Sequence, residues 1–190
     1  MKTALLAAVL LLAACQKEGA GNETAPASNG AAADGASKGE QRKTNLLQAL
    51  DSSADHKTLA NAVKSAGLAE TLAGAQPYTL FAPTEAAFAK LPPGAANELL
   101  APEAKGRLVA LLTGHVVPGV VTAEDLGRAI DRGKGKAQLA TVGGSNLSFA
   151  RNGGSIVVTD ASGGRALLTG AERLASNGVV LSVDGVLKGR

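Results

Sequence analysis

The stretch TLFAPTEAAFAKLP, residues 79–92, predicts a strand that turns directly into a short helix. The residues before Pro83 favour a strand, and proline cannot continue a hydrogen-bond ladder. Thr84 is a good N-cap for the helix that follows. The chain has only three Phe, and two of them, Phe81 and Phe88, lie here. We therefore expect both rings to share one corner of the core, where truncating either should cost about 3–5 kcal/mol.

The composition fits one globular domain. The chain has 190 residues, of which 45% are hydrophobic, but only 2% are aromatic and none is Trp. The core must therefore be built from Ala, Val and Leu. A formal net charge of +3 is too small to indicate a nucleic acid as partner, and few rings are available to stack on bases.

The N-terminus predicts a lipoprotein signal peptide over residues 1–15. Lys2 precedes an apolar run, residues 4–14, which is shorter than the roughly 20 residues that span a bilayer and fits the core of a signal peptide. The only cysteine, Cys15, follows small residues in a pattern that resembles the lipobox of bacterial lipoproteins. The resemblance implies cleavage before Cys15 and acyl chains, such as palmitate, on this residue. An ordinary signal peptide with a chance cysteine is the alternative.

Acylation of Cys15 would make the membrane a partner of the chain through its N-terminal lipid. Two or more acyl chains hold a protein firmly, whereas one holds it marginally. Gln16, rather than Asp, follows the cysteine, which favours the outer membrane if the source is Gram-negative. No thiol would remain for a disulfide, a nucleophile or a metal site.

Residues 16–43 predict a flexible tether. They contain no Leu, Ile, Val or aromatic residue. Such a segment cannot bury enough apolar surface to offset the entropy of ordering. A random coil of this length has a mean reach of roughly 30 Å, which would hold the following domain away from the lipid.

From Thr44 onward, helical patterns come first and strand patterns come last, which predicts an α+β domain over residues 44–190. Thr44 and Asn45 can cap the first helix and Asp55 the second. Gly143-Gly144 and Asn152-Gly153-Gly154 indicate hairpin turns. We expect helices over 46–50, 56–66, 69–73, 84–91, 95–100 and 103–113, a helical turn over 122–126, and strands over 78–82, 138–142, 145–151, 155–159, 165–169 and 179–184.

Three motifs in order resemble the signatures of the fasciclin (FAS1) family. Residues 79–88 resemble the first signature, residues 114–119 the central Tyr-His motif, and residues 177–187 the second signature. Gly114 stands where the family usually has Tyr, and the usual His-Val-Ile-Asp near the C-terminus is replaced by Leu-Ser-Val-Asp. The resemblance implies the FAS1 fold: a wedge of mixed β-sheet with helices packed along one side.

The resemblance also implies which residues bind and which support the fold. Animal members carry integrin-binding sequences around the Tyr-His motif, so the implied binding residues are His115, Val116, Val117, Pro118 and Gly119. The two outer signatures are expected to be structural, through Phe81, Pro83, Thr84, Phe88, Asn177, Gly178 and Asp184.

Several polar residues allow two interpretations. His115 is either a contact for a ligand or a half-buried histidine bonded to backbone, and we favour the second. Asp184 either pairs with His115 or accepts backbone N–H groups at a turn. His56 follows a predicted cap, and we expect it to be exposed to solvent.

Four basic residues, broken by Asp131, could bind an anionic polysaccharide or could form a solvated face, and we favour the second. They are Arg128, Arg132, Lys134 and Lys136.

Templates for catalysis fail on this sequence. No His, Asp or Glu set has the spacing of metal ligands, and no nucleophile elbow is present. The glycine pairs do not precede helices, so they do not indicate a phosphate loop. We therefore expect no enzyme activity, no cofactor and no metal.

The expected function is adhesion, or binding of a protein or polysaccharide, at the bacterial envelope. The alternative is a carrier or sensor that binds a small molecule in a cleft between helices and sheet. Hydrolysis is a third and weaker hypothesis.

Overall fold

The computed structural model describes residues 43–188. The predicted signal peptide with Cys15, and the predicted tether apart from Lys43, lie outside the described residues. Within residues 43–188, no helix combines the length and the hydropathy that spanning a bilayer requires.

The helices follow the predicted order, with three main differences. The start of the helix predicted at 103–113 is a separate 3-10 turn over Pro102–Ala104. Asp55 does not cap the second helix: it lies in a 3-10 turn, and the N-cap position belongs to His56. The helical turn predicted at 122–126 is a full helix that ends at Arg132, because Leu126 and Ile130 bury one face of it. The helical elements are α2 (Leu46–Asp51), η2 (Ala54–His56), α3 (Lys57–Ala66), α4 (Ala69–Ala73), α5 (Glu85–Ala89), α6 (Ala95–Leu100), η3 (Pro102–Ala104), α7 (Lys105–Thr113) and α8 (Ala123–Arg132).

The strands form one mixed sheet in the order β2-β1-β7-β6-β5-β4-β3. Strands β1 and β7 are parallel, and every other neighbouring pair is antiparallel. The expected α+β class and mixed sheet are confirmed. The strands are β1 (Tyr78–Pro83), β2 (Val116–Pro118), β3 (Lys136–Ala140), β4 (Asn146–Asn152), β5 (Ser155–Thr159), β6 (Arg165–Ala175) and β7 (Gly178–Val183).

Strand β6 continues well past its predicted end at residue 169. Its pairing with β7 shifts register between Leu168 and Glu172. Gly170 lies in this irregular region with φ +82°, a conformation that glycine adopts without a steric penalty. The bulge interrupts the alternating pattern, which is why the sequence indicated a shorter strand.

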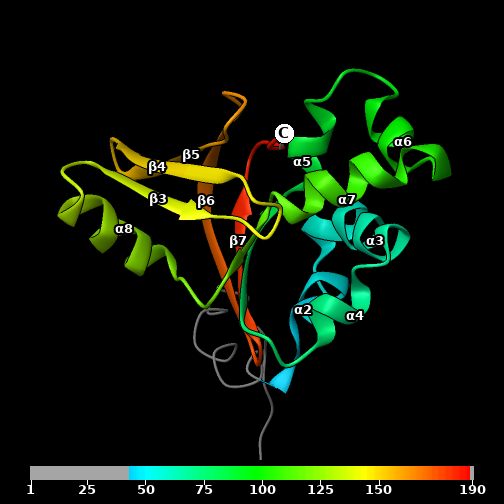
Figure 1. Cartoon of the computed structure of the whole chain (residues 1–190), viewed down its shortest axis with the longest axis horizontal. Coiled ribbons are helices and arrows are strands. Elements are labelled where there is room, and N and C mark those ends of the chain that lie inside the picture. Colours follow the sequence, from blue (N-terminus) through cyan, green and yellow to red (C-terminus); the bar gives the residue numbers. More distant parts are fainter. Residues whose placement is uncertain (1–42, 189–190) are drawn as a thin grey trace, which may run out of the picture. The chain divides into compact units, whose positions relative to one another are not determined.

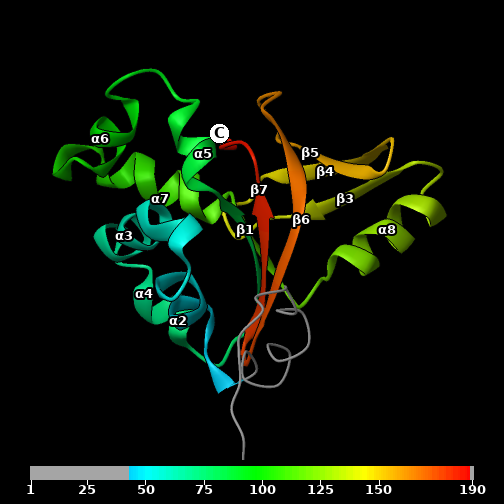
Figure 2. The same ribbon diagram turned by 180° about the vertical axis from the view of Figure 1, so that it is seen from behind.

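Both faces of the sheet are covered (Figure 1). Helices α2 to α7 gather on one side of β1 and β7, and α8 lies on the other side beside β3 and β4. Figure 2 shows the same arrangement from behind. The expectation of helices along one side therefore holds for all of the described α-helices except α8, whose Leu126 and Ile130 belong to the second core.

The alternation of side chains along β1 divides the interior into two cores. Leu80 and Ala82 pack with α2, α3, α4 and α7, whereas Phe81 packs with α8, β4 and β5. The ring of Phe81 lies 5.3 Å from that of Phe149, measured between centroids. Phe88 packs against the first core. The prediction that Phe81 and Phe88 share one corner is therefore wrong. Neighbouring positions of a strand face opposite sides of a sheet, so Phe81 faces away from Leu80 and Ala82. Phe88, in α5, packs on the same side as Leu80 and Ala82.

The expected structural roles of Thr84 and Asn177 are visible as hydrogen bonds. Thr84 caps α5 by accepting from the N–H of Ala87. Buried Asn177 accepts from the N–H of Leu46 at 2.8 Å and donates to the carbonyl oxygens of Leu72 and Gly74. The Asn177 side chain thereby joins the start of α2, the end of α4 and the turn into β7.

Candidate binding surface

The first signature and the central motif meet through the side chain of Thr79 on β1. The Thr79 hydroxyl donates to the carbonyl oxygen of Gly119 and accepts from the N–H of Val121, both at 2.8 Å. These two bonds fix the loop over residues 118–121, which connects β2 to α8. Val120, at the centre of this loop, is 53% exposed although it is apolar. The loop is therefore a fixed surface feature that presents an apolar side chain.

Burial limits which residues of the central motif a partner can reach. His115, Val116 and Val117 are buried, whereas Pro118 is exposed and Gly119 is partly exposed. The binding role of these five residues stays a prediction. A partner can directly contact only Pro118 and Gly119, because the other three residues lie in the interior.

His115 joins the end of α7 to the segment after β7. The N–H of Leu187 donates to Nε2 of His115 at 3.1 Å, so the ring proton lies on Nδ1, which donates to the carbonyl oxygen of Leu111 at 2.8 Å. The favoured interpretation, a histidine bonded to backbone, agrees with this geometry, although the ring is fully buried rather than half-buried. Burial lowers the pKa of His115 from its ordinary value, against the opposing effect of the Leu111 hydrogen bond.

His56 is also buried, so the expectation that it faces solvent is wrong. Its Nδ1 lies 2.9 Å from the hydroxyl of Ser53, and its Nε2 lies 3.2 Å from the hydroxyl of Ser182. Burial is the main cause of its lowered pKa. Ser182 lies within β7 and is only 4% exposed, so a substrate carbonyl cannot reach this serine–histidine pair in the folded sheet.

The two buried histidines predict that acid destabilises the fold. Below pH 6.5 histidine takes up a proton in the unfolded chain, but the lowered pKa values of His56 and His115 delay uptake in the folded chain. The unfolded state then binds more protons, so stability falls as the pH drops below 6.5. We expect the free energy of unfolding to decrease by up to about 1.4 kcal/mol per pH unit for each histidine. Urea unfolding between pH 5 and 7.5 measures this slope.

Single substitutions provide the control for this pH dependence. His56→Gln and His115→Gln should each remove one histidine's share of the slope, whatever they do to stability at neutral pH. A slope that both variants retain in full would show that other groups are responsible.

Asp184 does not pair with His115. Its Oδ1 accepts from the N–H of Leu167 at 2.7 Å, and its Oδ2 pairs with Nζ of Lys90 at 3.0 Å. The Leu167 hydrogen bond is the main reason that the pKa of Asp184 is lowered. The second of the two interpretations holds in its acceptor role, but the backbone N–H group belongs to Leu167 of β6 rather than to a turn.

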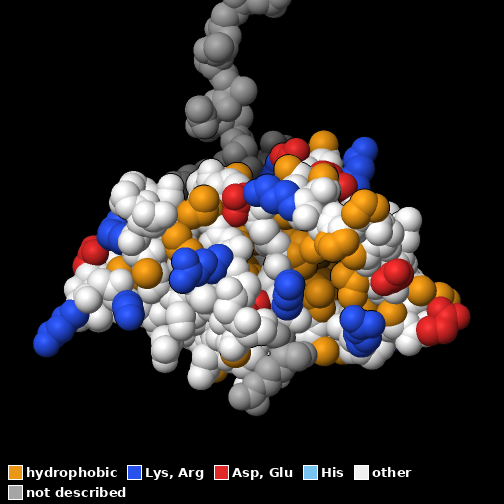
Figure 3. Space-filling view, turned by 90° about the horizontal axis from the view of Figure 1, so that it is seen from above, with side chains coloured by type: hydrophobic (Ala, Val, Ile, Leu, Met, Phe, Trp, Pro, Cys, Tyr) orange, Lys and Arg blue, Asp and Glu red, His pale blue; other side chains and the backbone are white. Residues whose placement is uncertain are grey.

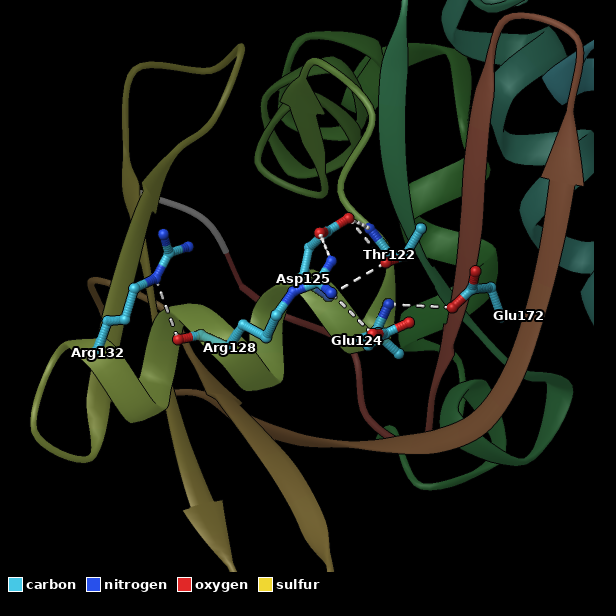
Figure 4. Close-up of polar contacts among 7 residues, drawn as sticks. Thr122, Glu124, Asp125, Arg128, Arg132 and Glu172 are labelled. Atoms are coloured by element: carbon cyan, nitrogen blue, oxygen red, sulfur yellow. Dashed lines mark hydrogen bonds and ion pairs between the residues drawn. The ribbon is translucent and has the colours of Figure 1, made fainter.

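The loop over residues 118–121 leads into a firmly fixed start of α8 (Figure 4). Thr122 and Asp125 form a capping box, in which each side chain accepts from the backbone N–H of the other. The N–H of Ala123 donates to a carboxylate oxygen of Glu172 from β6 at 3.0 Å. Acidic groups at a helix N-terminus are favourable because of the helix dipole.

Ion pairs on α8 neutralise part of its positive charge. Arg128 pairs with Glu124 at 2.8 Å and with Asp125 at 2.6 Å. The hydrogen bond from Arg128, followed by that from Thr122, lowers the pKa of Asp125 to about 2. This end of α8 is therefore a face of mixed charge.

The rest of the predicted basic cluster lies at the end of α8 and in the segment that leads into β3. Asp131 is paired with Arg151 at 2.9 Å. Within residues 43–188, Arg132, Lys134 and Lys136 form no ion pair. The acidic partners beside Arg128 make a solvated face of mixed sign a better description of the cluster than a polyanion site.

Comparison with known proteins gives the family. The model of the fasciclin domain matches residues 54–188. The chain belongs to the fasciclin family.

Two relatives of this fasciclin protein come from Synechocystis. It is 40% identical to Protein sll1483 over 130 residues, which cover 68% of this chain and 65% of that protein. It is 42% identical to Uncharacterized protein sll1735 over 84 residues, which cover 44% of this chain and 62% of that protein. The chain thus spans less than two thirds of the length of these relatives.

Similarity extends to animal proteins. The chain is 30% identical over 144 residues to transforming growth factor-beta-induced protein ig-h3 of Sus scrofa, covering 75% of this chain and 19% of that protein. A solved FAS1 domain pair from the insect cell adhesion molecule fasciclin I has the same fold, with a TM-score of 0.67 and a sequence identity of 19%. The match covers 77% of this chain and 51% of that chain.

Sequence reasoning did not single out Thr79 or Glu172 in this fasciclin domain. Thr79 carried one usable signal, since a hydroxyl within an otherwise apolar strand must find a partner when it is buried. Glu172 carried no such signal in the sequence, because the position of its carboxylate depends on the bulge in β6. Within the described residues, no three His, Cys, Asp or Glu side chains are grouped so that they could hold a metal ion.

Proposed function

We propose that this protein is a non-catalytic fasciclin domain, anchored to the bacterial envelope, that mediates adhesion by binding a protein or polysaccharide there. The observation that carries the proposal is the loop over residues 118–121. It begins with Pro118 and Gly119, the last two residues of the central motif, Thr79 holds it in place, and it exposes Val120 beside α8. A fixed loop that presents an apolar side chain binds at a low entropic cost.

The binding face proposed here consists of Pro118, Val120 and the exposed side of α8. Val120 would provide an apolar centre, and the mixed charges of α8 would provide a polar rim. This arrangement is typical of protein–protein contact surfaces. A polyanion would instead require a continuous basic face, which the acids beside Arg128 interrupt.

Acylation of Cys15 would provide the anchor, and residues 16–43 would provide the spacer. The lipobox-like residues before Cys15 support this part of the proposal. If the source is Gram-negative, Gln16 favours the outer membrane as the location.

Two substitutions in the full chain test the anchor and the binding face separately. In a bacterium that processes lipoproteins, Cys15→Ser should move the protein from the membrane fraction to the soluble fraction, because no acyl chain can be attached. Val120→Asp should leave the protein in the membrane fraction. The same variant should reduce binding to purified envelope proteins, peptidoglycan or lipopolysaccharide at least tenfold, because it places a charge at the centre of the contact.

Val142→Asp is the matched control, because Val142 is also exposed and apolar but lies outside the loop over residues 118–121. It should retain full binding. Equal losses in Val120→Asp and Val142→Asp would contradict the proposed face. A Cys15→Ser protein that still fractionates with membranes would contradict the proposed anchor.

A further inference from the structure

An apolar hollow of about 570 Å³ lies between α6, α7 and the segment that follows β7. In the space-filling view from above, hydrophobic side chains gather in a depression on this side of the molecule, with Lys and Arg side chains beside it (Figure 3). The volume is within the range of about 300–1,000 Å³ that small-molecule sites occupy. The residues that line it are Leu91, Ala95, Glu98, Leu99, Gly106, Arg107, Ala110, Leu111, Val186 and Lys188.

Two features of the helices leave this hollow open. Helix α6 has the sequence AANELL, yet none of its residues is buried, so its apolar side chains are only partly covered by the rest of the domain. Gly106 lies in α7, and a Cβ added to it would meet nothing within 4 Å. A glycine within a helix costs roughly 1 kcal/mol relative to alanine, and here no close contact requires it. The missing side chain widens the hollow.

The charges that line the hollow favour one kind of ligand. Arg107 and Lys188 contribute two positive charges, and neither side chain forms an ion pair or hydrogen bond with another described residue. The Glu98 carboxylate contributes one negative charge and forms no ion pair within residues 43–188. The excess is a single positive charge, which matches a carboxylate better than a doubly charged phosphate monoester. The guanidinium group of an arginine also pairs with both oxygens of a carboxylate.

We propose that this hollow binds a long-chain carboxylic acid, a fatty acid in chemical terms. The acyl chain lies on the aliphatic side chains of α6 and α7, and Arg107 and Lys188 hold the carboxylate at the mouth. The site is separate from the loop over residues 118–121, so the inference does not depend on the proposed adhesion role. It gives the carrier or sensor hypothesis a definite ligand class.

Isothermal titration of the purified full chain with dodecanoate, below its critical micelle concentration, tests the proposal. We expect one saturable site, with affinity rising about fourfold for each methylene between octanoate and dodecanoate. Dodecyltrimethylammonium should not compete, because its headgroup carries the wrong charge. Arg107→Gln should weaken binding at least tenfold, and Glu98→Gln should strengthen it.

Variants that fill the hollow show whether binding occurs there. Ala110 is exposed on α7, so Ala110→Phe should fold normally and abolish dodecanoate binding by occupying the space. Gly106→Leu should do the same from the neighbouring turn of the helix. Arg132→Gln on α8 is the matched control for Arg107→Gln and should bind dodecanoate as the unaltered chain does.

Three results would overturn the proposal: equal losses in Arg107→Gln and Arg132→Gln, unchanged binding in both filled variants, or equal affinity for dodecyltrimethylammonium. Val120→Asp should retain dodecanoate binding, and Ala110→Phe should retain binding to envelope components. A failure of one proposal is therefore distinguishable from a failure of the other.

Discussion

Replacement of Phe81 by Ala is expected to lower the free energy of unfolding by about 3–5 kcal/mol. The ring is 0% exposed and belongs to the core between the sheet and α8. Its nearest aromatic partner is Phe149, and the contact between such rings adds about 0.5–1.5 kcal/mol beyond the burial of area. Urea unfolding followed by far-UV circular dichroism measures the loss.

Phe88→Ala is the informative comparison for Phe81→Ala. Phe88 is only partly buried and packs against the other core, so the expected loss is smaller, about 1–3 kcal/mol. The effects of Phe81→Ala and Phe88→Ala should add within about 0.5 kcal/mol, whereas those of Phe81→Ala and Phe149→Ala should not add, because these two rings are in contact. Strong coupling between Phe81 and Phe88 would show that the two rings share one core after all.

Gly178→Ala is expected to destabilise the domain by about 3 kcal/mol or more. A Cβ at Gly178 would overlap the carbonyl oxygen of Tyr78 and would lie 2.9 Å from Cδ1 of Leu46. Tyr78 and Gly178 are partners in the parallel pairing of β1 with β7. The overlap therefore involves backbone that cannot move without disturbing the pairing of β1 with β7. The midpoint of urea unfolding should fall sharply.

Gly154→Ala is the matched control for Gly178→Ala. Gly154 lies in the turn between β4 and β5, where an added Cβ meets nothing within 4 Å, and its φ is not positive. Its stability should change by less than about 0.5 kcal/mol. A similar loss in the two variants would indicate a general effect of replacing glycine rather than the close approach of Tyr78.

Local patterns were sufficient for most of the secondary structure. The capping residues Asn45 and Thr84 occupy the positions predicted for them, and the strand predicted at 155–159 has the same bounds in the structure. The errors at Asp55 and at the end of β6 share a cause. In both places the decisive factor is a contact or a bulge that involves residues distant in the sequence, and local propensity contains no information about it.

The candidate site was less predictable than the fold. The central motif was located from sequence, but its division into buried His115, Val116 and Val117 and exposed Pro118 depends on what packs against each side of β2. The expectation that His56 is exposed was wrong for the same reason. Its partner Ser182 is far away along the chain, so the sequence could not show that both nitrogens of the ring would find hydroxyl groups.

The sequence by itself determined the order of most helices and strands, the α+β class and the family signatures, because caps, proline and side-chain periodicity act over a few residues. It did not predict the short strand β2. Only the tertiary structure decided that Phe81 and Phe88 enter different cores, that both histidines are buried, and that Thr79 fixes the loop over residues 118–121. It also decided that α6 and α7 leave an apolar hollow beside Arg107 and Lys188, whose side chains form no ion pair within residues 43–188. These properties depend on the side of the sheet that each residue faces and on segments that meet across the fold, and distance along the chain specifies neither.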